Sequence, residues 1–321
     1  MMRKVYYNHD GGVDDLVGLF LLLQMPDIDL VGVGVVNADC YVEPATSASQ
    51  KIIQVFGKGK DIPIAMSNAR PRNPFPSSWR EHAFTIDAMP MLNQDMTDQN
   101  KLLDQSADQH LSQILRESDQ AIDLVFVGPL TDLATVLTHN PKLSQKINGL
   151  YWMGGTFLAN GNVQEPHHDG TAEWNAFWDP EAVKVVWDAD IDIHMVGLES
   201  TNKVPLTNAI RQTWAQDHHI PGIDFLGQAY ALVPPMSFIH TNSTYFLWDV
   251  LTVAYFADPS LASSQVLTSD VMVYGVSQGR TIISDQGRPI QLVYDVDHDR
   301  FFDYITNLAR QAPYQGGQNE K

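Results

Sequence analysis

The chain has 321 residues, of which 44% are hydrophobic, and a formal net charge of −18. This hydrophobic content supports a sizeable core and excludes a disordered chain, while the negative charge makes nucleic acid and anionic membranes unfavourable partners. The single cysteine, Cys40, excludes an internal disulfide and a cysteine-based zinc site, and without an apolar leader or membrane-spanning stretch the sequence favours a cytoplasmic location.

Short β-branched or apolar runs alternate with amphipathic stretches along the chain. The runs, which we predict to be strands, cover residues 4–7, 30–36, 122–127, 149–153 and 191–196. The amphipathic stretches, which we predict to be helices, cover residues 14–24, 44–56, 102–117, 130–138 and 180–188. This alternation is typical of an α/β fold, with a mostly parallel central sheet and helices on both of its faces.

Two long stretches, residues 67–97 and 218–245, interrupt the alternation, and we predict both to be irregular insertions. Insertions of this length inside a compact domain usually form lids or binding loops. Residues 1–310 are expected to form a single domain, followed by a polar C-terminal tail over residues 311–321.

Three carboxylates follow the first predicted strand. Asp10, Asp14 and Asp15 lie within six residues, with Gly11 and Gly12 between them. Ligands of such sheets bind beyond the carboxyl ends of the strands, and clustered carboxylates suit a hard cation such as Ca²⁺ or Mg²⁺. The helix dipole also favours acidic residues in a first turn, so a structural explanation for the last two aspartates stays open.

Two other sites with closely spaced aspartates do not fit this segment. In an EF-hand the spacing continues to a glutamate at the twelfth position, whereas here the apolar residues 16–23 follow. A phosphatase with a nucleophilic aspartate at the strand end needs a carboxylate at position 8, and Asn8 cannot form an aspartyl-phosphate. A cation at this turn would need further ligands from elsewhere in the chain.

The sequence resembles the nucleoside hydrolase family, whose signature at this strand end is Asp-x-Asp-x-x-x-Asp-Asp. The resemblance extends over nearly the whole chain, through residues 8–15, 39–40, 73–76, 79–80, 127–130, 153–155, 161–162, 169–175, 178–180 and 248–249. It implies the Rossmann-like fold of that family and Ca²⁺-dependent hydrolysis of the N-glycosidic bond of ribonucleosides, with purine nucleosides preferred. There are two departures: Asn8 replaces the first aspartate of the signature, and residues 240–248 contain no arginine.

The resemblance also implies roles for individual residues. Ca²⁺ would be bound by the carboxylates of Asp10, Asp15 and Asp249 and by the backbone carbonyl of Val127. Asp10 would also act as the general base on a calcium-bound water. The groups expected to bind the ribose hydroxyls are Asp14, Asn162, Glu173 and Asn175, and Asp39 is expected to contact the base or the ribose.

A purine would be held between two tryptophans, Trp79 and Trp248, which fall at the places where the purine-preferring branch of the family has them. His240 is a candidate to donate a proton to the departing base, because it lies in one of the insertions. The other tryptophans are expected to pack in the core: Trp152, Trp174, Trp178, Trp187 and Trp214.

Two alternatives to a purine-preferring hydrolase stay open. The same chemistry could act on pyrimidine or mixed ribonucleosides, or Asn8 and the altered loop could mark a nucleoside-binding protein with negligible turnover. Catalysis is favoured over silent binding because every carboxylate assigned to metal and water is present. Members of the family commonly form dimers or tetramers, so the resemblance implies a homo-oligomer that acts on small nucleosides in salvage.

Overall fold

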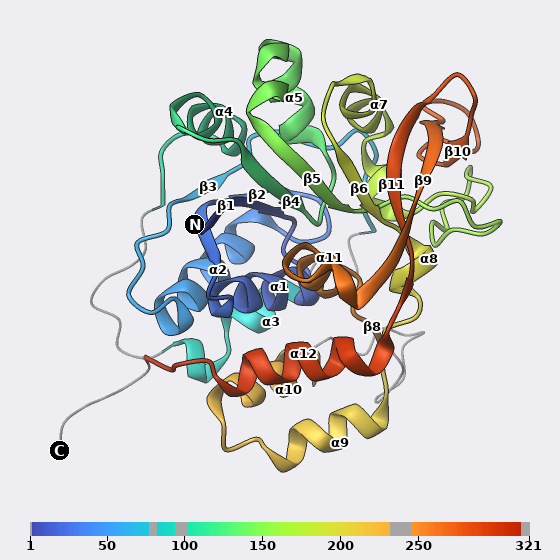
Figure 1. The fold of residues 1–321 in the computed structure, drawn as a ribbon. Coiled ribbons are helices and arrows are strands. Elements are labelled where there is room, and N and C mark those ends of the chain that lie inside the picture. Colours follow the sequence, from blue (N-terminus) through green and yellow to red (C-terminus); the bar gives the residue numbers. More distant parts are fainter. Residues whose placement is uncertain (1, 77–81, 94–101, 232–244, 316–321) are drawn as a thin grey trace.

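The computed structural model describes residues 2–76, 82–93, 102–231 and 245–315 (Figure 1). Nine strands form one sheet in the order β10-β9-β11-β6-β5-β4-β1-β2-β3. They are β1 (Arg3–His9), β2 (Ile28–Val35), β3 (Ile64–Met66), β4 (Ile122–Phe126), β5 (Ile147–Met153), β6 (Ile193–Val196), β9 (Ala262–Val271), β10 (Thr281–Ile283) and β11 (Arg288–Val296). Seven neighbouring strands, from β11 to β3, run parallel, and β9 pairs antiparallel with both β10 and β11. The predicted mostly parallel α/β sheet is confirmed.

Helices cover both faces of the sheet (Figure 1). One face packs against α1 (Val13–Gln24), α2 (Val42–Phe56) and α11 (Trp248–Ala257), with α3 (His82–Asp87), α9 (Asn208–Gln216), α10 (Pro221–Ala231) and α12 (His298–Arg310) farther out. The other face packs against α4 (Ala107–Glu117), α5 (Thr131–His139) and α7 (Pro180–Asp188). Each face has its own buried apolar core, so the sheet is covered by hydrophobic contacts on both sides.

All five predicted strands and all five predicted helices are present, with ends shifted by a few residues. The prediction of irregular structure was wrong for parts of both insertions. The first contains α3, and the second contains α10, which begins at Pro221 because proline's fixed φ suits the first turn of a helix. Two short strands, β7 (Pro205–Leu206) and β8 (Tyr245–Phe246), form a separate antiparallel pair.

The tail predicted from residue 311 follows directly after α12. Its described part is fixed to the domain, because the N–H of Gln315 donates to the carbonyl of Val55 at 2.9 Å and the hydroxyl of Tyr314 donates to the carbonyl of Met91 at 3.0 Å. Among the described residues, no helix has the length and apolar character needed to cross a membrane.

Candidate active site

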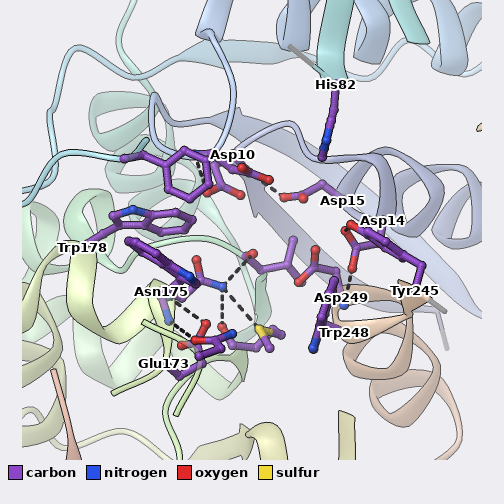
Figure 2. A pocket seen from close by; sticks show the side chains of 16 residues that line it. Asp10, Asp14, Asp15, His82, Glu173, Asn175, Trp178, Tyr245, Trp248 and Asp249 are labelled. Atoms are coloured by element: carbon purple, nitrogen blue, oxygen red, sulfur yellow. Dashed lines mark hydrogen bonds between the residues drawn. The ribbon is translucent and has the colours of Figure 1, made fainter. Parts of the chain in front are cut away.

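A cavity of about 270 Å³ opens beyond the carboxyl ends of β1, β4 and β5 (Figure 2). Ten of the twelve residues predicted for the site line this cavity: Asp10, Asp14, Asp15, Asp39, Val127, Asn162, Glu173, Asn175, Trp248 and Asp249. The remaining two, Trp79 and His240, lie outside the described residues. The structure therefore brings together side chains from most of the length of the chain.

The turn from β1 to α1 places the first aspartates. Gly11 has a φ of +90°, and a Cβ there would lie 2.4 Å from the Cβ of Ala45, so this position requires glycine. The backbone N–H of Asp10 donates to Oδ1 of Asp15 at 2.9 Å, which closes the turn around the carboxylate. Local sequence thus fixes both aspartates at the end of the strand.

Carboxylates from two helices meet in the cavity. Oxygens of Asp14, Asp15 and Asp249 lie within 4.8 Å of one another, and all three residues are buried. This trio contains Asp14 where the sequence predicted Asp10, because Asp14 Oδ2 accepts the N–H of Asp249 in the first turn of α11, at 3.3 Å. Asp10 is also buried beside Asp15, and its Oδ2 accepts the N–H of Asp39 at 3.0 Å.

The charge on this cluster is not balanced by the described protein. Burial first, and then repulsion from neighbouring carboxylates, raises the pKa of Asp10 and Asp249 well above the usual range and that of Asp14 to about 7. No lysine or arginine is found among the described residues that line the cavity. Buried oxygen ligands without a protein counter-charge fit a divalent metal ion.

Polar groups on the opposite side come from the loop between β5 and α6, residues 154–173, and from α6 (Trp174–Trp178) itself. Glu173 caps α6 by accepting the N–H of Asn175 at 2.9 Å, it also accepts the N–H of Gly155 at 2.8 Å, and burial raises its pKa to about 7. Asn175 Nδ2 donates to the carbonyl of Val127 at 3.1 Å. This carbonyl is a predicted metal ligand, and its oxygen keeps a second lone pair that could bind a metal ion. Asn162 Oδ1 accepts the N–H of Trp174 at 3.1 Å.

Aromatic side chains line two sides of the cavity (Figure 2). On one side the rings of Trp248 and Tyr245 meet with centroids 4.9 Å apart. On the other, Phe75 packs edge-on against Trp174 at 5.3 Å and Trp178 at 4.8 Å. Trp174 and Trp178 are buried in a small apolar cluster, as predicted, and they also line the cavity, whereas Trp152, Trp187 and Trp214 are buried away from it.

Sequence reasoning also missed His82, Met153, Phe75 and Tyr245, which line the cavity. His82 begins α3; neither ring nitrogen has a hydrogen-bond partner among the described residues, and burial lowers its pKa to about 4. Nothing in the sequence singled it out. For Phe75, Trp174 and Trp178 the signal was available, because all three lie inside the stretches that carry the family resemblance.

Asn8 does not line the cavity. Its Nδ2 donates to Oδ2 of Asp132 at 3.0 Å, and the hydroxyl of Ser67 donates to Oδ1 of the same carboxylate at 2.5 Å. Asn8 and Asp132 are fully buried. The departure from the family signature thus concerns a buried pair behind the cavity.

Comparisons with known proteins agree with this geometry. A family model described as inosine-uridine preferring nucleoside hydrolase matches residues 5–303. The crystal structure of an inosine-uridine preferring nucleoside hydrolase from Bacillus anthracis is 55% identical and superposes with a TM-score of 0.91, covering 96% of this chain and 99% of that one.

More distant relatives give a consistent result. A non-specific ribonucleoside hydrolase of Salmonella paratyphi A is 26% identical, with 95% of this chain and 96% of that protein aligned. A probable uridine nucleosidase 2 of Arabidopsis thaliana is 28% identical over 64% of this chain, and the match spans 62% of the plant protein's length. A purine-preferring ribonucleoside hydrolase from Gardnerella vaginalis, 23% identical, shares the fold with a TM-score of 0.77, covering 97% of this chain and 100% of that one.

Proposed function

The chain belongs to the inosine-uridine preferring nucleoside hydrolase family, and we propose that it hydrolyses the N-glycosidic bond of ribonucleosides to free base and ribose, with purine nucleosides preferred. The observation that carries this proposal is the composition of the cavity. A cluster of buried carboxylates, a set of groups suited to sugar hydroxyls and two aromatic walls all face one space. A small nucleoside presents the matching features: a diol, a ring oxygen and a flat base.

We assign the cation as Ca²⁺, held by the carboxylates of Asp10, Asp15 and Asp249 and by the carbonyl of Val127, with Asp14 close enough to take part. An all-oxygen donor set of this kind suits Ca²⁺, which accepts many oxygen ligands in flexible geometry. When bound, the ion would fix the position of a water and of the ribose hydroxyls and would lower the pKa of that water modestly.

The protein's own groups supply the rest of the reaction. Asp10 is the general base that takes the proton from the attacking water as the water's oxygen bonds to C1′ of the ribose. Cleavage of the glycosidic bond leaves positive charge on the sugar ring, and the carboxylates of Asp14 and Glu173 stabilise that charge more than they stabilise the neutral substrate. Asn162 and Asn175 orient the sugar by binding its hydroxyls.

The departing base lies against Trp248 and Tyr245. A bicyclic purine presents more ring area to an indole than a pyrimidine does, and the electron-rich ring faces favour a purine that is gaining a proton. His82 is neutral at pH 7 because its pKa is lowered, so it acts as a hydrogen-bond partner of the substrate instead of a strong acid. Proton donation by His240 and stacking on Trp79 stay predictions.

A second candidate function is hydrolysis of purine and pyrimidine nucleosides alike. The observation that favours it is the 55% identity to the Bacillus anthracis protein, which is described as inosine-uridine preferring. The two candidates share the catalytic groups and differ only in how strongly binding depends on the size of the base.

Release of free base from inosine and from uridine, measured with Ca²⁺ and after chelation, tests both. Calcium-dependent release of hypoxanthine with little uracil supports purine preference, and equal release supports the mixed specificity. If neither base is released above a no-protein control, the nucleoside-binding alternative replaces both. In the purine-preferring case, Trp248→Ala should lower kcat/KM for inosine about tenfold and for uridine much less.

A further inference from the structure

The turn between β9 and β10, residues 272–280, lies beside the loop that carries the sugar-binding groups (Figure 1). None of its residues lines the cavity. We propose that this support turn (residues 272–280), together with Thr281 at the start of β10, positions Asn162 and Glu173 for the sugar, and that His168 is the residue through which it acts. The proposal rests on the proposed function, since it assumes that the loop binds ribose.

His168 joins the loop to the support turn. Its side chain is only 2% exposed, its Nδ1 accepts the N–H of Gly170 at 3.0 Å, and its Nε2–H donates to the carbonyl of Gln278 at 2.9 Å. A backbone N–H can only donate, so this arrangement requires the neutral tautomer with the proton on Nε2. One buried ring therefore fixes the backbone of both segments.

The neighbouring residue adds two further links. The N–H of Asp169 donates to the carbonyl of Val276 at 2.9 Å, and the hydroxyl of Ser277 donates to the carboxylate of Asp169. The tip of the loop is thus fixed to the support turn through three adjacent residues of that turn, 276–278.

The sugar-binding groups lie a short way along the same loop. The N–H of Gly161 donates to the carbonyl of Gly170 at 2.7 Å, and the N–H of Asn162 donates to the carbonyl of Ala172 at 3.0 Å. Because Gly170 also donates to His168, a shift of the ring moves the segment that is paired with Asn162 and that leads directly into Glu173.

A second attachment holds the start of the loop. Thr281, the first residue of β10, is 1% exposed; its hydroxyl donates to the carbonyl of Thr156 at 2.6 Å and accepts the N–H of Thr156 at 3.0 Å. The end of the loop leads into α6, where Gly279, with a φ of +87°, packs so closely on Phe177 that a Cβ would lie 2.6 Å from its backbone. The support turn and Thr281 therefore contact the loop at its start and its tip, and they contact the helix α6 that directly follows the loop.

This arrangement separates sugar positioning from metal binding. Among the described residues, residues 272–281 make no hydrogen bond to Asp10, Asp15 or Asp249. A displacement of about 1 Å in a substrate-positioning group can cost on the order of 100-fold in rate. We expect loosening of the support turn to weaken nucleoside binding while leaving the affinity for Ca²⁺ alone unchanged.

Two matched pairs of variants test the proposal. His168→Ala removes both ring hydrogen bonds, whereas His168→Gln keeps an N–H donor near the position of Nε2; Thr281→Val removes the hydroxyl, whereas Thr281→Ser keeps it. We expect the first member of each pair to raise KM for inosine about tenfold and the second to restore most of the affinity. Gln286→Ala, an exposed change in the next turn along the chain, is the control and should leave KM unchanged.

Steady-state kinetics and calorimetric titration with Ca²⁺ alone are the measurements. A lower melting temperature in His168→Ala and Thr281→Val with unchanged KM would show a structural role only and would overturn the proposal, as would an equal loss of Ca²⁺ affinity. If the wild type releases no base from inosine, the proposed function fails instead. In that case, inosine binding can be measured from the quenching of tryptophan fluorescence. The positioning role then predicts that inosine binds more weakly to His168→Ala and Thr281→Val than to the wild type.

Discussion

The amide of Asn8 donates to a fully buried carboxylate, that of Asp132, which also accepts the hydroxyl of Ser67. Burial raises the pKa of Asp132 to about 6, and the two donated hydrogen bonds oppose that rise. The backbone carbonyl of Asn8 accepts the N–H of Val127, a residue that lines the cavity. An aspartate at position 8 would bring a second carboxylate within hydrogen-bond distance of the first. An asparagine at position 8 therefore suits Asp132, because its amide can donate a hydrogen bond to the buried carboxylate.

We expect Asn8→Asp alone to lower both stability and activity. The double variant, Asn8→Asp with Asp132→Asn, should restore them. The single change places two buried carboxylates about 3 Å apart and should cost on the order of 2 kcal/mol of unfolding free energy and weaken Ca²⁺ binding, because the ends of β1 and β4 shift. Denaturant unfolding and kcat/KM measure both effects. Additive losses in the double variant would contradict the pairing.

At the residue scale, the carboxylates could be predicted because their spacing at a strand end has few purposes. This applies to Asp10 and Asp15, whereas Asp249 was assigned only through the family resemblance; all three line the cavity. Trp174 and Trp178 could not be assigned from residue type, since each is buried in a small apolar cluster and lines the cavity at the same time. A large side chain can pack in a core with one face of its ring and line a cavity with the other, so burial does not exclude a role in the site.

At the scale of elements, the turn between β1 and α1 depends on two glycines with different functions. Gly11 supplies a positive φ and a close approach to α2. Gly12 has an ordinary extended backbone, but a Cβ there would lie 2.7 Å from carboxylate oxygens of both Asp15 and Asp39. The first glycine shapes the turn, and the second leaves room for the carboxylates that follow it.

Replacing Gly11 by alanine should destabilise the fold by about 2 to 4 kcal/mol, since it adds a left-handed backbone penalty to a clash with Ala45. Ca²⁺ affinity should fall as well, because Asp10 directly precedes the turn. Gly59→Ala is the matched control: Gly59 has a φ of +72° but open space around its Cβ position, so it should cost about 1 kcal/mol and leave Ca²⁺ affinity intact. Equal effects of the two changes on Ca²⁺ affinity would exclude a specific role for the turn.

Elements with a clear apolar period could be predicted, and those without one could not. The buried pattern of β4 and the amphipathic pattern of α4 identify them directly. β9 has mostly polar and half-exposed side chains, ASSQVLTSDV, and it is a strand because β10 and β11 pair with it on both sides. The support turn after β9 could not be predicted from the sequence either, because its role depends on contacts with residues more than a hundred positions away.

At the scale of the whole molecule, the buried carboxylates of the site lower the free energy of unfolding of the metal-free protein when they are ionised. The metal-free protein buries Asp10, Asp14, Asp249 and Glu173, and burial raises the pKa of each; Asp14 and Glu173 reach about 7. The ordinary values, which apply to the unfolded chain, are near 4. Between about pH 4 and pH 7 the folded state therefore holds more protons than the unfolded state, so the unfolding free energy of the metal-free protein falls as the pH rises.

A bound divalent cation supplies the positive charge that protons supply at low pH, so the stabilisation by Ca²⁺ should grow with pH. We expect the increase in Tm on adding Ca²⁺ at a fixed concentration to be small at pH 5 and about 5 °C or more at pH 8, where fewer protons compete for the carboxylates. Calorimetric scans with Ca²⁺ and with chelator at each pH measure it, and Asp249→Asn should reduce the shift at pH 8. A shift that is constant or shrinks as the pH rises would mean that these carboxylates do not bind the ion, and the proposed hydrolysis would need a different metal site.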